Sequence, residues 1–293
     1  MPTLKELKTR ISSVKSTEQI TRAMKLVAAA KMKRAIDNAL ASRPYSDEVT
    51  AVLQSLMART DTAGHPLLEP HDAVENAAVV VITADRGLCG SFNNGLLRKL
   101  DSWLWEQGRS STVFEDPEFM VYGKKGRDFL QRRDRRIGRL AVDMKPADFG
   151  SEVAKLVADL TGRYTRGELD AVYLVYNRFV STLTQEPTVE QLFPLAELAS
   201  GANEEPEHLV DFVYEPDQAT ILSEILPLFL RTRLHQVFLE STAGEHAARM
   251  TAMDAASRNA KDVIDRLTLE YNRARQAAIT RELVEIVAGA EAL

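Results

Sequence analysis

The segment 85–93 is the first place in this sequence where residue types and spacing could support chemistry. It reads Asp-Arg-Gly-Leu-Cys-Gly-Ser-Phe-Asn and directly follows a run of apolar residues. A glycine turn between a strand and a helix can bind phosphate through backbone N–H groups. This turn, however, matches neither the G-x-G-x-x-G pattern of dinucleotide-binding folds nor the Gly-Lys-Ser/Thr of a P-loop. We therefore interpret it as a structural turn, with nucleotide binding as the less favoured alternative.

The remaining short motifs give little support to catalysis or metal binding. Asp148-Phe149-Gly150 resembles the magnesium motif of kinases in three letters, but the other kinase motifs do not accompany it. Cys89 is the only cysteine, which excludes a disulfide within the chain and a thiolate metal cluster. The five histidines are scattered. We expect no catalytic residue, no cofactor and no metal site.

Two segments are strongly basic in a chain whose net charge is −5. Residues 1–43 contain ten Lys or Arg against three Asp or Glu, and residues 124–139 contain eight against two. Single-strand nucleic-acid sites interleave such residues with stacking aromatics, a pattern that neither segment shows. We interpret 124–139 as a solvated helix face, with docking of an acidic partner as the alternative. For 1–43, a solvated coiled-coil face and a partner-binding surface are equally favoured.

Residues 1–58 are predicted to form one long helix. Leu4, Leu7, Ile11 and Val14 follow the alternating three-and-four spacing of a heptad seam. The following residues are rich in alanine, which has the highest helix propensity and a small side chain. This composition predicts a thin, basic rod, which Pro44 would kink or interrupt.

Residues 77–200 alternate between strand-like and helix-like patterns, which predicts a compact, Rossmann-like α/β domain with a largely parallel sheet. The predicted strands are 78–83, 119–122, 170–176 and 188–192, and the predicted helices are 93–107, a helix after Gly123, and 151–164.

Residues 210–293 are predicted to form a second coiled-coil helix. Between 217 and 288, glycine occurs only at Gly244 and proline only at Pro227. Apolar and small residues alternate steps of three and four at Met250, Met253, Ser257, Ala260, Ile264, Leu267, Tyr271, Ala274 and Ala278. A helix of this length extends on the order of 100 Å, so it needs a long partner helix. We therefore predict an α/β fold with long helices, in which the N- and C-terminal helices form an antiparallel coiled coil.

Four blocks of the sequence, 4–31, 85–94, 245–253 and 271–290, resemble the gamma subunits of F-type ATP synthases. They cover both ends and the middle of the chain in the family's order. The cysteine pair and the inserted hairpin of the plastid branch are lacking, so the resemblance is to the bacterial type and implies no thiol regulation.

The resemblance implies a central rotor shaft that is not catalytic by itself. Such a shaft couples proton flow through the membrane c-ring to ATP synthesis or hydrolysis at the catalytic sites of the alpha3beta3 hexamer. The implied partners are this hexamer, the epsilon and delta subunits of the soluble head, and the c-ring, without nucleic acid and without direct insertion into the membrane. No run approaches the ~20 apolar residues of a membrane span, and no leader precedes Leu4. We expect a peripheral protein on the cytoplasmic face of the bacterial plasma membrane.

The resemblance also implies roles for individual residues. The positions implied to couple the shaft to the surrounding beta subunits are Met24, Arg249, Arg275, Gln276, Thr280 and Glu282. Tyr214 falls in the foot region, which is implied to meet epsilon and the c-ring.

Two other classes of protein fit parts of the pattern. A free-standing α/β enzyme with helical arms would need a catalytic constellation that we do not find. A coiled-coil scaffold unrelated to energy conversion would explain the rod but not the ordered blocks.

Overall fold

The computed structural model describes residues 3–57, 65–71, 73–109, 111–195 and 217–291. The two long helices are α1 (Leu4–Met57) and α6 (Gln218–Glu291). The elements between them are β1 (Ala77–Ile82), α2 (Phe92–Gly108), η1 (Thr112–Phe114), β2 (Glu118–Tyr122), α3 (Lys124–Gln131), β3 (Ile137–Ala141), η2 (Pro146–Asp148), α4 (Phe149–Thr165), β4 (Ala171–Phe179) and β5 (Gln185–Phe193). The chain divides into two compact units, one formed by Met1–Ala29 with Arg249–Leu293 and the other by Ala30–Ala248.

The sheet of the second unit has the strand order β3-β2-β1-β4-β5. The first four strands are parallel, and β5 is antiparallel to β4. This is the order of a doubly wound fold, in which the connections turn in opposite directions on either side of β1. The predicted Rossmann-like domain with a largely parallel sheet is confirmed.

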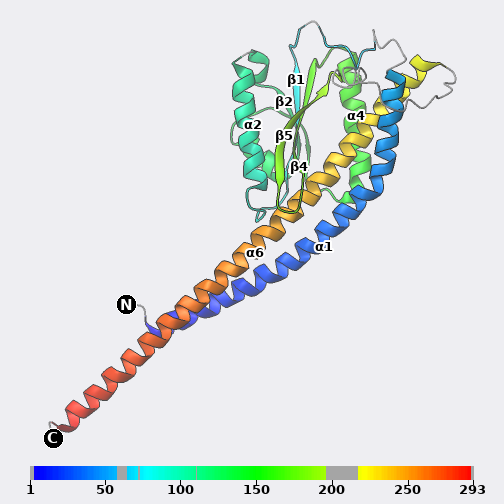
Figure 1. Cartoon of the computed structure of the whole chain (residues 1–293). Coiled ribbons are helices and arrows are strands. Elements are labelled where there is room, and N and C mark those ends of the chain that lie inside the picture. Colours follow the sequence, from blue (N-terminus) through cyan, green and yellow to red (C-terminus); the bar gives the residue numbers. More distant parts are fainter. Residues whose placement is uncertain (1–2, 58–64, 72, 110, 196–216, 292–293) are drawn as a thin grey trace. The chain divides into compact units, whose positions relative to one another are not determined.

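Each face of the sheet carries its own hydrophobic core. Every residue of β1 is buried because both faces are covered. Val79 and Val81 face the core made with α2 and α3, whereas Val80 and Ile82 face the core made with α4. In Figure 1, α2 and α4 lie on opposite sides of the strands.

The long helices complete the core on the α4 side. The end of α1 contributes Leu53 and Leu56, which are fully buried. The first part of α6 contributes a row of leucines at steps of four, Leu222, Leu226, Leu230 and Leu234, which are also buried. Polar bonds add to this packing, since the Arg233 guanidinium donates to the Glu190 carboxylate on β5 at 2.7 Å. In this unit the helices are therefore integral parts of the α/β domain.

The other unit is the antiparallel coiled coil of the chain ends. Leu7 and Ala28 of α1 are buried, as are Met253 and Ala260 of α6. The Lys25 ammonium pairs with the Asp254 carboxylate at 2.5 Å between the two helices. All nine predicted seam positions of α6 are buried or half-buried. The predicted coiled coil is confirmed.

Two details of the sequence-based prediction are wrong. Residues 124–139 do not form one helix face, because α3 ends at Gln131 and the edge strand β3 begins at Ile137. Along β3, half-buried residues alternate with exposed ones, so the strand has no apolar run. Pro44 does not interrupt α1, which runs from Leu4 to Met57 with the following residues Val49 and Leu53 buried in the core. The alternative expectation of a kink at Pro44 stays a prediction.

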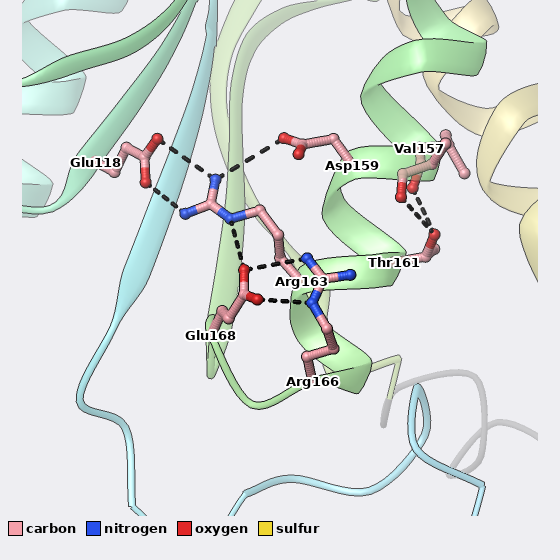
Figure 2. Close-up of polar contacts among 8 residues, drawn as sticks. Glu118, Val157, Asp159, Thr161, Arg163, Arg166 and Glu168 are labelled. Atoms are coloured by element: carbon pink, nitrogen blue, oxygen red, sulfur yellow. Dashed lines mark hydrogen bonds and ion pairs between the residues drawn. The ribbon is translucent and has the colours of Figure 1, made fainter.

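A cluster of ion pairs joins the last turn of α4 to the amino end of β2 (Figure 2). The Arg163 guanidinium pairs with the Glu118 carboxylate at 2.6 Å and also reaches Asp159 and Glu168. The hydrogen bond with Glu118 is the main cause that raises the pKa of Arg163. Arg166 pairs with Glu168 in turn. The cluster fixes α4 against the strand and has a structural role.

Candidate functional site

The glycine turn after β1 is bonded into the loops beside it. One oxygen of the Asp85 carboxylate accepts the backbone N–H of Lys124 at 3.0 Å, and the other accepts that of Asp143 at 2.9 Å. The side-chain oxygen of Asn93 accepts the N–H of Ala84 at 2.9 Å. Asp85 thus ties together the loops that follow β1, β2 and β3, which is a structural task.

Glycine allows the neighbouring loop to approach this turn closely. Gly123 has a φ of 103°, and a Cβ there would lie 2.2 Å from the carbonyl oxygen of Thr83. The Thr83 hydroxyl also accepts the N–H of Gly126 at 2.9 Å. The carboxyl ends of β1 and β2 are therefore joined by backbone contacts that leave no space for a side chain.

Open doubly wound sheets bind their ligands in the crevice at the carboxyl ends of the strands. Here, Phe238, Thr242 and Glu245 of α6 lie across that edge. Between them and the ends of β1, β2 and β3 is a hollow of only about 60 Å³. Small-molecule sites measure roughly 300–1,000 Å³. The crevice is thus filled by the chain's own helix, which argues against the free-standing enzyme.

Gly244 lets α6 lie close to the turn and the neighbouring hairpin. A Cβ at this position would lie 3.2 Å from a ring carbon of Phe92 and 3.2 Å from the Cγ of Gln185. Both residues belong to elements at the carboxyl edge of the sheet. Gly244, the only glycine between residues 217 and 288, therefore marks the close contact of the long helix with the α/β domain.

The described residues show no group of three or more His, Cys, Asp or Glu that could hold a metal ion. Cys89 is buried, and the Asn93 side-chain amide donates to its Sγ at 3.1 Å. His71 lies 2.6 Å from the Asp170 carboxylate. This His–Asp contact joins residues far apart in the sequence, so spacing alone could not reveal it.

The coupling residues implied by the family resemblance lie in two groups along the coiled coil. Met24 and Arg249 are half-buried. Met24 is next to Lys25, whose contact with Asp254 lowers the pKa of that carboxyl group. Arg249 is a few residues before Asp254 on α6. The two residues are therefore at a similar level of the coiled coil.

The second group lies near the end of α6. All four residues of this group are exposed, namely Arg275, Gln276, Thr280 and Glu282. They begin 26 residues after Arg249, which is about 40 Å along a helix. Tyr214 lies outside the described residues.

The end of α6 extends beyond the start of α1. The two helices run in opposite directions, and Lys25 of α1 is paired with Asp254 of α6. Leu4, the first residue of α1, is 21 residues before Lys25, so it lies opposite about residue 275 of α6. Beyond it, the apolar side chains are between 49% and 68% exposed, namely Ile279, Leu283, Val284, Ile286 and Val287. The sequence-based predictions did not include this cluster, whose apolar residues alternate with polar ones after the seam.

No helix in the described ranges combines the length and the apolar character needed to cross a membrane.

Comparisons with known proteins agree with this architecture. The model of the ATP synthase family matches residues 3–293. The ATP synthase gamma chain of Pelotomaculum thermopropionicum is 44% identical over 297 residues, with full coverage of both chains. That of Chlorobaculum tepidum is 42% identical over 294 residues, covering 100% of this chain and 99% of the relative.

Solved structures share the fold at lower identity. A chain in the mitochondrial ATP synthase of Euglena gracilis aligns with a TM-score of 0.66 at 18% identity and covers 99% of this chain and 94% of its own. A chain from the central stalk and c-ring of the Tetrahymena thermophila mitochondrial ATP synthase aligns with a TM-score of 0.55 at 24% identity. The alignment covers 81% of this chain and 99% of the Tetrahymena chain.

A coiled coil of the chain ends, combined with a doubly wound sheet whose crevice is filled by the chain's own helix, defines an α/β protein with two long terminal helices. The chain belongs to the ATP synthase gamma chain family. It is accordingly one subunit of the ATP synthase complex and is not catalytic alone.

Proposed function

We propose that this chain is the central rotor shaft of an F-type ATP synthase. In this role the coiled coil turns inside the alpha3beta3 hexamer, and its unequal faces impose different states on the three catalytic sites. The foot is joined to the membrane c-ring, so that proton flow and ATP synthesis or hydrolysis are coupled. The similar Tetrahymena chain belongs to a central stalk and c-ring assembly, which supports this role.

The observation that carries the proposal is the apolar end of α6. Five large apolar side chains on about two turns of helix are exposed and, in the described part of the chain, have no α1 residues beside them. Contiguous apolar surface of this kind is characteristic of an interaction site. Positions i, i+3 and i+4 share one face of a helix, so these side chains form an apolar face on the end of α6, and we infer that a socket receives this face.

The polar residues near this end are proposed to contact the walls of that socket. Arg275 and Gln276 lie where α1 begins, and Thr280 and Glu282 follow on the exposed end of α6. Met24 and Arg249 would form a second level of contact, about 40 Å away along α6. Contacts at two levels would hold the shaft on its axis and transmit torque.

The remaining partners follow from the family resemblance. We propose that Tyr214 belongs to the foot that meets the epsilon subunit and the c-ring, and that the delta subunit belongs to the same soluble head. We place the complex on the cytoplasmic face of a bacterial plasma membrane, with this chain as a peripheral component. Close similarity to bacterial gamma chains supports this placement.

The test is co-purification from cell membranes with a variant of the apolar end. A tagged chain is expected to bring alpha, beta and c subunits with it. Leu283→Asp should weaken retention of the alpha3beta3 hexamer, because it introduces a charge into a socket that excludes water. The control is Leu269→Asp, since Leu269 is similarly exposed, at 61%, but lies before this end. Recovery of the chain without alpha and beta subunits would contradict the proposal.

A further inference from the structure

The α/β unit carries a hollow of about 530 Å³ on the side of the sheet covered by α2 and α3. It is formed by the end of α2, by η1 and by the segment between α3 and β3. The buried side chains of Leu104 and Phe114 contribute to its lining. Arg109, Arg133 and Arg135 also line it. An apolar lining combined with several arginines is a composition typical of protein interfaces.

Trp105 also lines this hollow, and it is 66% exposed. The other tryptophan of the chain, Trp103, is buried and contacts Phe114 and Tyr173. The Arg109 guanidinium lies 5.0 Å from the Trp105 ring centre, so the two side chains form a cation–π pair at the surface. Tryptophan and arginine are the residues that most often supply binding energy in interfaces.

The three arginines differ in how they are engaged. The Arg133 guanidinium forms an ion pair with the Asp101 carboxylate at 3.0 Å. Its central carbon lies 3.6 Å from the centre of the Phe129 ring. The Arg135 guanidinium donates to the carbonyl oxygen of Glu115. Within the described ranges, by contrast, Arg109 makes no ion pair. Arg133 and Arg135 are thus bonded within the domain, whereas the charge of Arg109 lies beside the exposed Trp105 ring and can pair with a partner.

The charge of this surface indicates the chemistry of its partner. The segment that supplies Arg133 and Arg135 is the basic stretch 124–139, in a chain that is acidic as a whole. Asp101 and Glu115 also line the hollow, and their negative charge would repel a polyphosphate or a nucleic-acid backbone. A polypeptide can place its carboxylates selectively near Arg109 and its apolar side chains near Trp105.

We propose that this hollow is the docking site for an acidic segment of another subunit of the complex. An apolar side chain of that segment enters the hollow against Trp105, and a neighbouring Asp or Glu pairs with Arg109. The inference rests on the proposed function, because it requires that the chain is assembled with other subunits.

The experiment uses the assembled complex with a photoreactive phenylalanine in place of Trp105. Irradiation should link this position to one other subunit, within a peptide in which Asp or Glu residues flank an apolar residue. The control position is Leu183, which is 79% exposed in the turn between β4 and β5 and does not line the hollow. Position 183 should not capture the same peptide.

A charge variant tests the role of Arg109 directly. In the cross-linking background, Arg109→Glu should lower the yield about tenfold, the effect of losing an important interface residue. Arg98→Glu is the matched control, since it makes the same charge change on the exposed surface of α2 outside the hollow. Its yield should remain close to that of the parent.

Several outcomes would overturn the proposal. They are capture of lipid, nucleic acid or a second copy of this chain, capture of a peptide without acidic residues, and an equal loss of yield in both charge variants. Absence of any cross-link in a complete complex would overturn it as well. If the complex does not assemble around the unmodified chain, it is the proposed function that fails, so the two failures are distinguishable.

Discussion

At the scale of single residues, Asp170 shows how a buried charge organises this domain. Its carboxylate lies 2.6 Å from the Nδ1 of His71 and accepts the backbone N–H groups of Glu75 and Asn76 at 2.9 and 2.8 Å. Burial alone would raise the pKa of Asp170, but the bonds from His71 and the two N–H groups outweigh it, so the pKa is lowered. The residue fixes the loop that leads into β1.

Asp170→Asn should therefore destabilise the domain by about 2 kcal/mol, the typical contribution of hydrogen bonds to a charged group. Because the folded-state pKa is below the ordinary value of 3.8, the stabilisation is present above that pH and is lost as the pH falls through the folded pKa. Urea unfolding from pH 7 downwards should show a constant difference between wild type and variant that shrinks below about pH 4. Asp128→Asn, which removes a more exposed carboxylate, should have little effect. A difference that grows with acid would contradict the account.

Met24 belongs to the residue scale as a proposed contact of the rotating shaft. Met24→Lys adds a charge beside Lys25 at a half-buried position of the coiled coil. We expect the complex to assemble but to pump fewer ions for each ATP hydrolysed, because the new charge alters a contact that must slide during rotation. Met24→Leu, which nearly conserves volume, is the control. If inverted membrane vesicles with Met24→Lys pump the same number of ions for each ATP hydrolysed as wild type, Met24 does not belong to the coupling surface.

At the scale of elements, the close contact of α6 with the carboxyl edge of the sheet depends on Gly244. Gly244→Val would press a branched side chain against Phe92 and Gln185, so we expect a loss of about 1–3 kcal/mol in the free energy of unfolding. Gly150 is a matched control, since it is also helical and a Cβ there meets nothing within 4 Å. Gly150→Val should change the unfolding midpoint little. Equal effects of the two variants would mean that the contact is not tight.

The coiled coil is the second element whose integrity can be tested. Ile264 is a half-buried seam position of α6. Ile264→Pro removes a helix hydrogen bond and clashes with the preceding turn, which costs about 3 kcal/mol or more. We expect the variant to lose assembly with alpha and beta subunits in size-exclusion chromatography. Ile264→Ala, which keeps the helix, should still assemble, and normal assembly of the proline variant would contradict the role of the seam.

The sequence predicted those elements whose signal is local and periodic. The seam from Met250 to Ala278 and the apolar strand β1 have such signals, and both were located correctly. The edge strand β3 was missed because Gly138 and Arg139 separate its apolar residues, so no apolar run marks it. The position of α6 over the carboxyl edge could not be predicted, because it depends on contacts between residues more than 100 positions apart, such as Gly244 and Phe92.

At the scale of the whole molecule, the candidate site was only partly visible in the sequence. The residues carried over from the family, such as Met24 and Arg275, come from recognition of family-like blocks and not from any chemical pattern. The apolar residues at the end of α6 stand in the sequence, but their exposure became apparent only when the pairing of Lys25 with Asp254 showed where α1 begins. The function is thus a property of surfaces that local patterns do not define.

The most direct test of the account is to observe rotation of this chain in a single complex. The alpha3beta3 hexamer would be fixed to a glass surface, and a gold particle would be attached through a cysteine introduced at Leu183, an exposed position of the α/β unit, after replacement of Cys89 by serine. With ATP present, the account predicts that the particle rotates in one direction in three equal steps. A particle that stays still while the same complexes hydrolyse ATP would contradict it.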